Sequence, residues 1–227
     1  MKEVVKLHIP DGYLGPYTCA FFYLIMIPIW YKAFRWLKNL KPSQVPLLGV
    51  LTAFSFLVMM YNMPVPGGTT AHIVGGTIIA ILISPWAATV SLTIVLLIQA
   101  LFFGDGGITT YAANVFNMGV VLPFVGYYAY RFLTRRLKLN EIVSAGIGAY
   151  VGIVTAAIMA GIELGIQPYL QPGYCPYPLR VSVPAMAIAH LVTAGPAAAV
   201  VTAAVVWYVK KSRPDLFAMR TITKTRG

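Results

Sequence analysis

Apolar segments of roughly membrane-spanning length follow one another along almost the whole chain, separated by short polar joints. Crossing the hydrocarbon core of a membrane takes about 20 apolar residues as a helix. We distinguish seven apolar segments, at residues 17–37, 45–63, 72–83, 87–103, 111–132, 142–166 and 181–209. Proline or glycine marks most of the joints, and no long polar linker divides the chain. The pattern predicts an all-α integral membrane protein, a single-domain bundle of about seven transmembrane helices over residues 1–227.

The third segment, 72–83, is short for a full span. It either extends back into Thr69 and Thr70 or tilts little and ends at Pro85. A small-residue pattern in the sixth segment, Gly148-x-x-x-Gly152, favours close helix packing, either inside the bundle or against a membrane partner.

Composition supports the membrane assignment. Hydrophobic residues make up 59% of the chain and charged residues 10%, whereas a soluble domain carries about a quarter charged residues. Backbone groups in lipid must be satisfied within the segment, so we expect helices rather than strands. Residues 1–7 lack the apolar core of a signal peptide, and we expect no cleaved leader.

The placement of basic residues predicts the orientation. The formal net charge is +11, and 14 of the 17 lysines and arginines follow the first, fifth and seventh segments, on one side of a seven-span arrangement. Lysine and arginine mark the cytoplasmic side. We therefore expect residues 1–16 outside and the basic tail 210–227 in the cytoplasm of a prokaryotic cell, with the protein in the plasma membrane. Contact of that tail with lipid headgroups is favoured over nucleic-acid binding.

Several kinds of chemistry find no support in the sequence. No nucleotide-binding G-x-x-x-x-G-K-[ST] motif occurs, nor H-E-x-x-H, G-x-S-x-G or C-x-x-C. Glu163 lies within a span and is a functional candidate by default, yet a single carboxylate makes no proton relay. Cys19 and Cys175 both fall near the outer side, where a disulfide could form, although two free thiols are favoured. We expect neither an enzyme nor a resident cofactor.

The three histidines all fall on the outer side of this topology or in the outer half of a span. His8 sits in a short segment whose Pro10 and Gly12 favour a defined turn. His72 follows glycines and threonines that open the third segment, and His190 lies within the seventh. Each alone is commonly a surface or hydrogen-bonded core histidine. His8 and His72 together favour a metal site. Imidazole and backbone nitrogens suit Ni, Co, Cu or Zn.

At three stretches the chain resembles the CbiM/NikM family, the substrate-binding components of energy-coupling-factor transporters for cobalt and nickel. The N-terminal stretch reads His-Ile-Pro-Asp-Gly from His8. The most specific stretch runs from His72-Ile-Val-Gly-Gly through Gln99 and Gly106-Gly107-Ile-Thr-Thr to Asn114-Val-Phe-Asn-Met-Gly119. A weaker one covers Pro184–His190 and Ala194-Gly-Pro.

The resemblance implies a chelate at the N-terminus. In the family, the free amine of the first residue, the amide nitrogen of the second and the imidazole of that second residue hold one ion, and a distant histidine completes a square. His8 matches the second-residue histidine and His72 the distant one. Asn114, Thr69 and Thr70 are then expected nearby, as donors that orient the imidazoles.

One departure from the family pattern concerns the start of the chain. Six residues precede Leu7, so its nitrogen is an amide rather than an amine. We hypothesise that translation begins at position 7, because a leucine codon such as UUG also serves as a prokaryotic start. Proteolytic trimming would give the same terminus. Leu7 would then contribute a backbone nitrogen to the metal.

The resemblance implies high-affinity uptake of Co(II) or Ni(II) as transported substrate. The partners it implies are a transmembrane coupling subunit and ATPase subunits, with room for a small accessory membrane subunit. A vitamin-specific component of the same transporter type is the alternative. Such a site would be larger, lined by aromatic residues, and independent of His8. The choice between cobalt and nickel, and the roles of His190 and Glu163, stay open.

Overall fold

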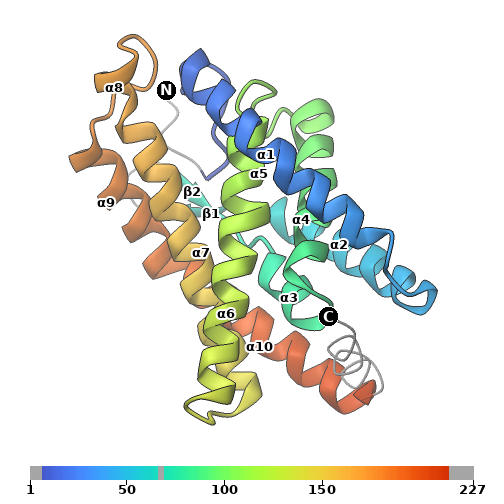
Figure 1. The fold of residues 1–227 in the computed structure, drawn as a ribbon. Helices are drawn as coiled ribbons and strands as arrows, with labels where there is room; N and C mark the ends of the chain where they lie inside the picture. Colours follow the sequence, from blue (N-terminus) through green and yellow to red (C-terminus); the bar gives the residue numbers. More distant parts are fainter. Residues whose placement is uncertain (1–6, 66–68, 215–227) are drawn as a thin grey trace.

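The computed structural model describes residues 7–65 and 69–214, which form a helical bundle around a short two-stranded hairpin (Figure 1). Its elements, in chain order, are α1 (Pro16–Leu37), a 3-10 turn (Pro42–Gln44), α2 (Val45–Met59), β1 (Met63–Val65), β2 (Thr69–Ala71), α3 (Gly76–Leu82), α4 (Pro85–Ile98), α5 (Tyr111–Val115), α6 (Leu122–Arg135), α7 (Glu141–Gly165), α8 (Gln167–Leu170), α9 (Leu179–Ala189) and α10 (Gly195–Ser212).

Three π-helical turns interrupt the long helices. Gln99–Phe103 continues α4, Phe116–Val121 joins α5 to α6, and His190–Ala194 joins α9 to α10. Such turns are rare and occur mostly at functional sites. Two of these begin at residues that the sequence already singled out, Gln99 and His190.

Within the described residues, five helices are long and apolar enough to cross a membrane: Pro16–Leu37, Pro42–Met59, Pro85–Phe103, Glu141–Leu170 and Leu179–Ser212. The expected segment 111–132 corresponds to α5, the π-turn and α6, an unbroken helical run that carries Asn114 and Asn117 in its interior. The helical bundle is confirmed, whereas the count of seven spanning helices stays a prediction.

The third expected segment departs most from the prediction. It extends back into Thr69 as anticipated, but as strand β2 and an irregular stretch before the seven-residue helix α3. All residues of α3 are buried. Non-helical backbone is tolerated at membrane depth when protein surrounds it, and α4, α6, α7 and α10 all pack against α3. The expectation of helices alone fails here for that reason.

The basic joints gather at one end of the bundle. The turn between α1 and α2, the turn between α6 and α7 and the end of α10 lie in the lower part of Figure 1, while α8 and the start of α1 lie at the top. Lys210 and Glu141 form an ion pair of 2.6 Å that ties the end of α10 to the start of α7. The assignment of that end to the cytoplasm stays a prediction, and residues 1–6 and 215–227 lie outside the described part.

The small residues of α7 pack inside the molecule. A Cβ added at Gly148 would lie 2.6 Å from the Gly126 carbonyl oxygen, and one at Gly152 would lie 2.6 Å from the Leu122 carbonyl oxygen. Of the two alternatives for Gly148-x-x-x-Gly152, close packing within the bundle, against α6, is the one observed.

Candidate metal centre

The segment 7–15 is folded into the bundle rather than frayed. Leu7 and Ile9 have no exposed surface, and His8 is 2% exposed. Gly12, with a φ of +84°, turns the chain back towards α1 in a conformation that suits glycine. The backbone N–H of Gly15 then donates to Gln167 Oε1 at 3.0 Å, and Cys175 N–H donates to the Tyr13 carbonyl at 3.2 Å.

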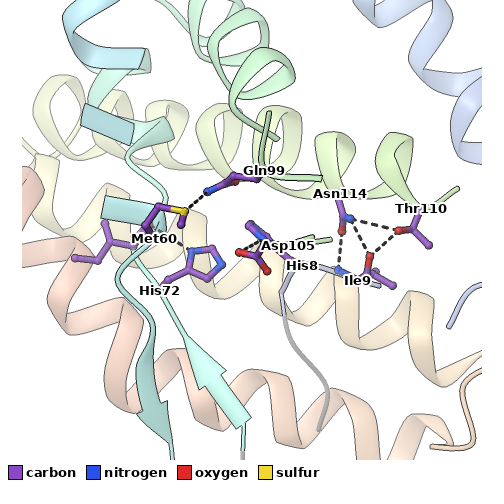
Figure 2. Close-up of polar contacts among 9 residues, drawn as sticks. His8, Ile9, Met60, His72, Gln99, Asp105, Thr110 and Asn114 are labelled. Atoms are coloured by element: carbon purple, nitrogen blue, oxygen red, sulfur yellow. Dashed lines mark hydrogen bonds and ion pairs between the residues drawn. The ribbon is translucent and has the colours of Figure 1, made fainter. Parts of the chain in front are cut away.

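Asn114 and Thr110 hold the peptide of Ile9 beside the histidine. Asn114 Oδ1 accepts from Ile9 N–H at 2.8 Å, and its Nδ2 donates to the Ile9 carbonyl at 3.0 Å. The Thr110 hydroxyl donates to the same carbonyl at 2.6 Å (Figure 2). The position of His8 is therefore set through the main chain of its neighbour.

Asp11 fastens the segment to the loop before α5. Its carboxylate accepts hydrogen bonds from Ile108 N–H at 3.0 Å and Thr109 N–H at 2.8 Å, and from the Thr109 hydroxyl. Burial would raise the pKa of Asp11, but the bonds from the Thr109 side chain and from the amides of Ile108, Thr109 and Thr110 lower it below its ordinary value. Asp11 is thus ionised at neutral pH.

His8 and His72 meet in the interior. Their ring centroids are 4.6 Å apart and their planes are inclined by 64°. Nε2 of each ring is buried without a hydrogen-bond partner, while His72 Nδ1 lies 3.4 Å from the Ile73 carbonyl. Neutral imidazole is the form that binds metal. These two imidazoles lie close together and have unpaired nitrogens, so they are two candidate metal ligands.

Asp105 also lies beside the two histidines, and the sequence analysis did not predict this. Its Oδ2 lies 2.8 Å from His8 Nδ1, although the contact lacks the alignment of a hydrogen bond. Figure 2 shows this carboxylate beside the His8 ring, with Gln99, Met60 and His72 around it. Asp105 is one of only six acidic residues and stands in a glycine-rich loop. That rarity was the available signal.

The remaining expected residues fall in different places. Asn114 contacts Ile9 rather than an imidazole, and for Thr70 no contact with either imidazole is observed; the Thr69 side chain and residues 66–68 lie outside the described part. His190 is fully buried, with Nδ1 2.9 Å from the Met186 carbonyl and Nε2 unpaired. Its π-turn packs against β1 and β2, near His72.

Glu163 and the cysteines belong to other surroundings. Glu163 accepts from Asn117 Nδ2 at 2.8 Å, and Gln167 donates to its carbonyl. Cys19 and Cys175 are both buried and free, as the sequence favoured.

The side chains alone do not complete a metal site. In the described ranges, no three His, Cys, Asp or Glu side chains gather closely enough to hold an ion. Two imidazoles therefore need further donors of another kind, such as backbone nitrogen or oxygen. Residue 7, buried directly beside His8, is where such a donor would lie.

Comparisons with known proteins agree on one group. Residues 8–216 match the family model described as CbiM, cobalt uptake substrate-specific transmembrane region. A Methanocaldococcus jannaschii protein named provisionally as metal transport protein MJ1569 is 73% identical over 215 residues, which cover 94% of this chain and 96% of that protein. The fused nickel transport protein NikMN of Rhodobacter capsulatus is 46% identical over 94% of this chain, which spans only 65% of that longer protein.

Solved structures show the same fold. A crystal structure of a transition metal transporter superposes with a TM-score of 0.86 at 46% identity, covering 97% of this chain and 100% of that one. A truncated transition metal transporter gives a TM-score of 0.86 at 49% identity, covering 90% of this chain and 98% of that one.

Proposed function

The chain belongs to the CbiM family of substrate-specific membrane components for cobalt and nickel transport, and on that premise we propose that it captures one Co(II) or Ni(II) ion between His8 and His72. The observation that carries the proposal is the pair of buried rings with centroids 4.6 Å apart, each with an unpaired nitrogen. Imidazole nitrogen suits both ions. The metal is cargo, so the site must also release it.

The backbone nitrogens of residues 7 and 8 supply the remaining donors in this proposal. With the chain starting at position 7, the terminal amine and the His8 amide nitrogen bind the ion together with the His8 imidazole, and His72 closes the square. Burial of Leu7 and His8 supports this arrangement. It also keeps water away, so the ion is occluded beneath the segment 7–15 and the loop 103–110.

Energy for transport comes from partners. The sequence has no nucleotide-binding motif, so the proposed cycle needs a transmembrane coupling subunit and ATPase subunits, with an accessory membrane subunit as a further candidate. The bound ion is released to the cytoplasm when they reorient this chain.

The test combines metal content with the chemical nature of the terminus. We expect the native protein, purified in detergent, to carry about one Ni or Co per chain and to begin at position 7 by N-terminal sequencing and intact mass. His72→Ala should abolish stoichiometric metal at unchanged expression. Asn140→Asp, at the far start of α7, is the matched control.

Two results would count against the proposal. Full metal content in His72→Ala would show that His72 is not a ligand. If a vitamin copurifies as well, the vitamin-binding alternative is favoured. Metal bound by a protein with an intact Met1 would retain the two histidines but exclude the terminal amine as a ligand.

A further inference from the structure

A carboxylate reaches the buried histidine pair from the outer loop. Asp105 Oδ2 lies 2.8 Å from His8 Nδ1, and the two side chains are 23% and 1% exposed, respectively. The acidic group thus has one side towards the surface and the other against the imidazole. Asp105 therefore contacts both the solvent-exposed surface and the proposed metal site.

The loop aims Asp105 at His8 independently of any metal. Gly104 and Gly106 flank it with φ values of +63° and +89°, which favour glycine. Asp105 N–H donates to the Gln99 carbonyl at 3.1 Å, at the π-turn that ends α4. A Cβ at Gly106 would come within 3.2 Å of Asn114 Nδ2. The aspartate is therefore anchored from both sides.

The contacted nitrogen is the one that the ion needs. Only Nδ1 of an imidazole lies close enough to the backbone nitrogen of its own residue for both to bind the same ion. In the proposed chelate, His8 Nδ1 must therefore turn to the metal. The Asp105 carboxylate already stands at that nitrogen, so an arriving cation meets it first.

Charge balance gives the carboxylate a second role. A divalent ion held by a neutral amine, neutral imidazoles and at most one deprotonated amide leaves a net positive charge, which is costly to bury unless it is compensated. The other carboxylates of the described part are engaged elsewhere: Asp11 with the loop amides, Glu163 with Asn117 and Glu141 with Lys210.

We propose that Asp105 is a positioning residue for metal capture. Its carboxylate stands at His8 Nδ1–H before the ion arrives; the ion then replaces the Nδ1 proton, which is released to solvent, and the carboxylate stays beside the ion as its counter-charge. This inference rests on the proposed function. It adds a role for a residue outside the nitrogen ligand set.

Asp105→Asn keeps the shape and removes the charge. We expect Ni(II) affinity, measured by competition with a coloured chelator, to fall about 10- to 100-fold, the usual effect of removing a partner behind a metal ligand. The ligand-field absorption of bound Ni(II) should keep its position, because the nitrogen ligands are unchanged. Asp105→Glu should recover part of the affinity. Glu141→Gln, which removes the same charge at the opposite end, should bind as the unmodified protein does.

A second measurement uses the rate of Ni(II) binding rather than its affinity. The association rate of Ni(II) with the unmodified protein should fall with rising salt, because exposed charges are screened, and this slope should be shallower in Asp105→Asn. A structural role in the loop would leave the slope unchanged.

The outcomes separate the two proposals. Loss of binding in His72→Ala together with normal affinity and normal salt slope in Asp105→Asn would overturn the role of Asp105 and leave the metal site intact. A displaced absorption band in Asp105→Asn would make it a direct ligand and would equally overturn the inference. Binding that survives in His72→Ala would instead refute the proposed function itself.

Discussion

At the scale of single residues, Asn114 hydrogen-bonds to both the N–H and the carbonyl of Ile9, as a paired β-strand would. Its amide offers one acceptor and one donor, and the Ile9 peptide takes both, at 2.8 and 3.0 Å. Asparagine and glutamine are the side chains that carry this pair in one planar amide. The backbone next to His8 is thus satisfied and fixed inside the bundle, where an unpaired peptide would be costly.

Asn114→Asp should break this clamp. The carboxylate still accepts from Ile9 N–H, but its second oxygen faces the Ile9 carbonyl without a proton between them. We expect a loss of about 1–3 kcal/mol in the free energy of unfolding, seen as a lower thermal midpoint in detergent, and weaker Ni(II) binding. Asn140→Asp is the control, because Asn140 caps α7 by accepting from Ile142 N–H and aspartate caps equally well. Equal midpoints for the two variants would contradict the clamp.

The sequence analysis singled out the two histidines but did not predict which residues contact them. His8 and His72 stood out because imidazoles are scarce in the chain and both fell on one side of the topology. Asp105 was not linked to His8, because that contact depends on how the glycine-flanked loop closes over a segment 97 positions earlier. Asn114 was expected to orient a ring, whereas its contacts are with the Ile9 backbone.

At the scale of elements, hydropathy predicted the long helices closely. The first segment, expected at 17–37, is α1 at Pro16–Leu37, and the sixth, expected at 142–166, is α7 at Glu141–Gly165. These elements follow from local composition. The stretch around α3 does not, because its mixture of strand, irregular backbone and short helix is allowed only by the helices that enclose it. The π-turns likewise have no local signal.

The contact of α6 with α7 depends on the absence of side chains. Gly152→Ala would place a methyl group 2.6 Å from the Leu122 carbonyl oxygen and 3.2 Å from the backbone of Gly126. We expect a loss of about 1–3 kcal/mol from overpacking, measured as a lower thermal midpoint.

Gly49→Ala is the matched control for this substitution. Its added methyl group would have no atom within 4 Å, and alanine favours the helix over glycine by about 1 kcal/mol. The control should be as stable as the unmodified protein or more so. A Gly152→Ala variant as stable as the control would show that α6 can move away from α7 at little cost.

At the scale of the whole molecule, the charge asymmetry predicts how the bundle sits in the membrane. Arg136, in the turn before α7, should face the cytoplasm and Arg180, at the start of α9, the outside. In intact cells, a membrane-impermeant thiol reagent should label Arg180→Cys and should reach Arg136→Cys only after the cells are opened. The native Cys19 and Cys175 are buried and give little background. The reverse pattern would invert the orientation.

The long reach of the contacts made by the segment 7–15 bears on how the protein is made. This segment is synthesised early, yet Asn114, Gln167 and Cys175, which hold it in place, are synthesised 105 to more than 150 residues later. Until α7 and the loop before α9 have been inserted, the early histidine has no finished pocket to enter. In the proposed function, the pocket for the ion is therefore complete only when the bundle has assembled, and a half-made chain lacks it.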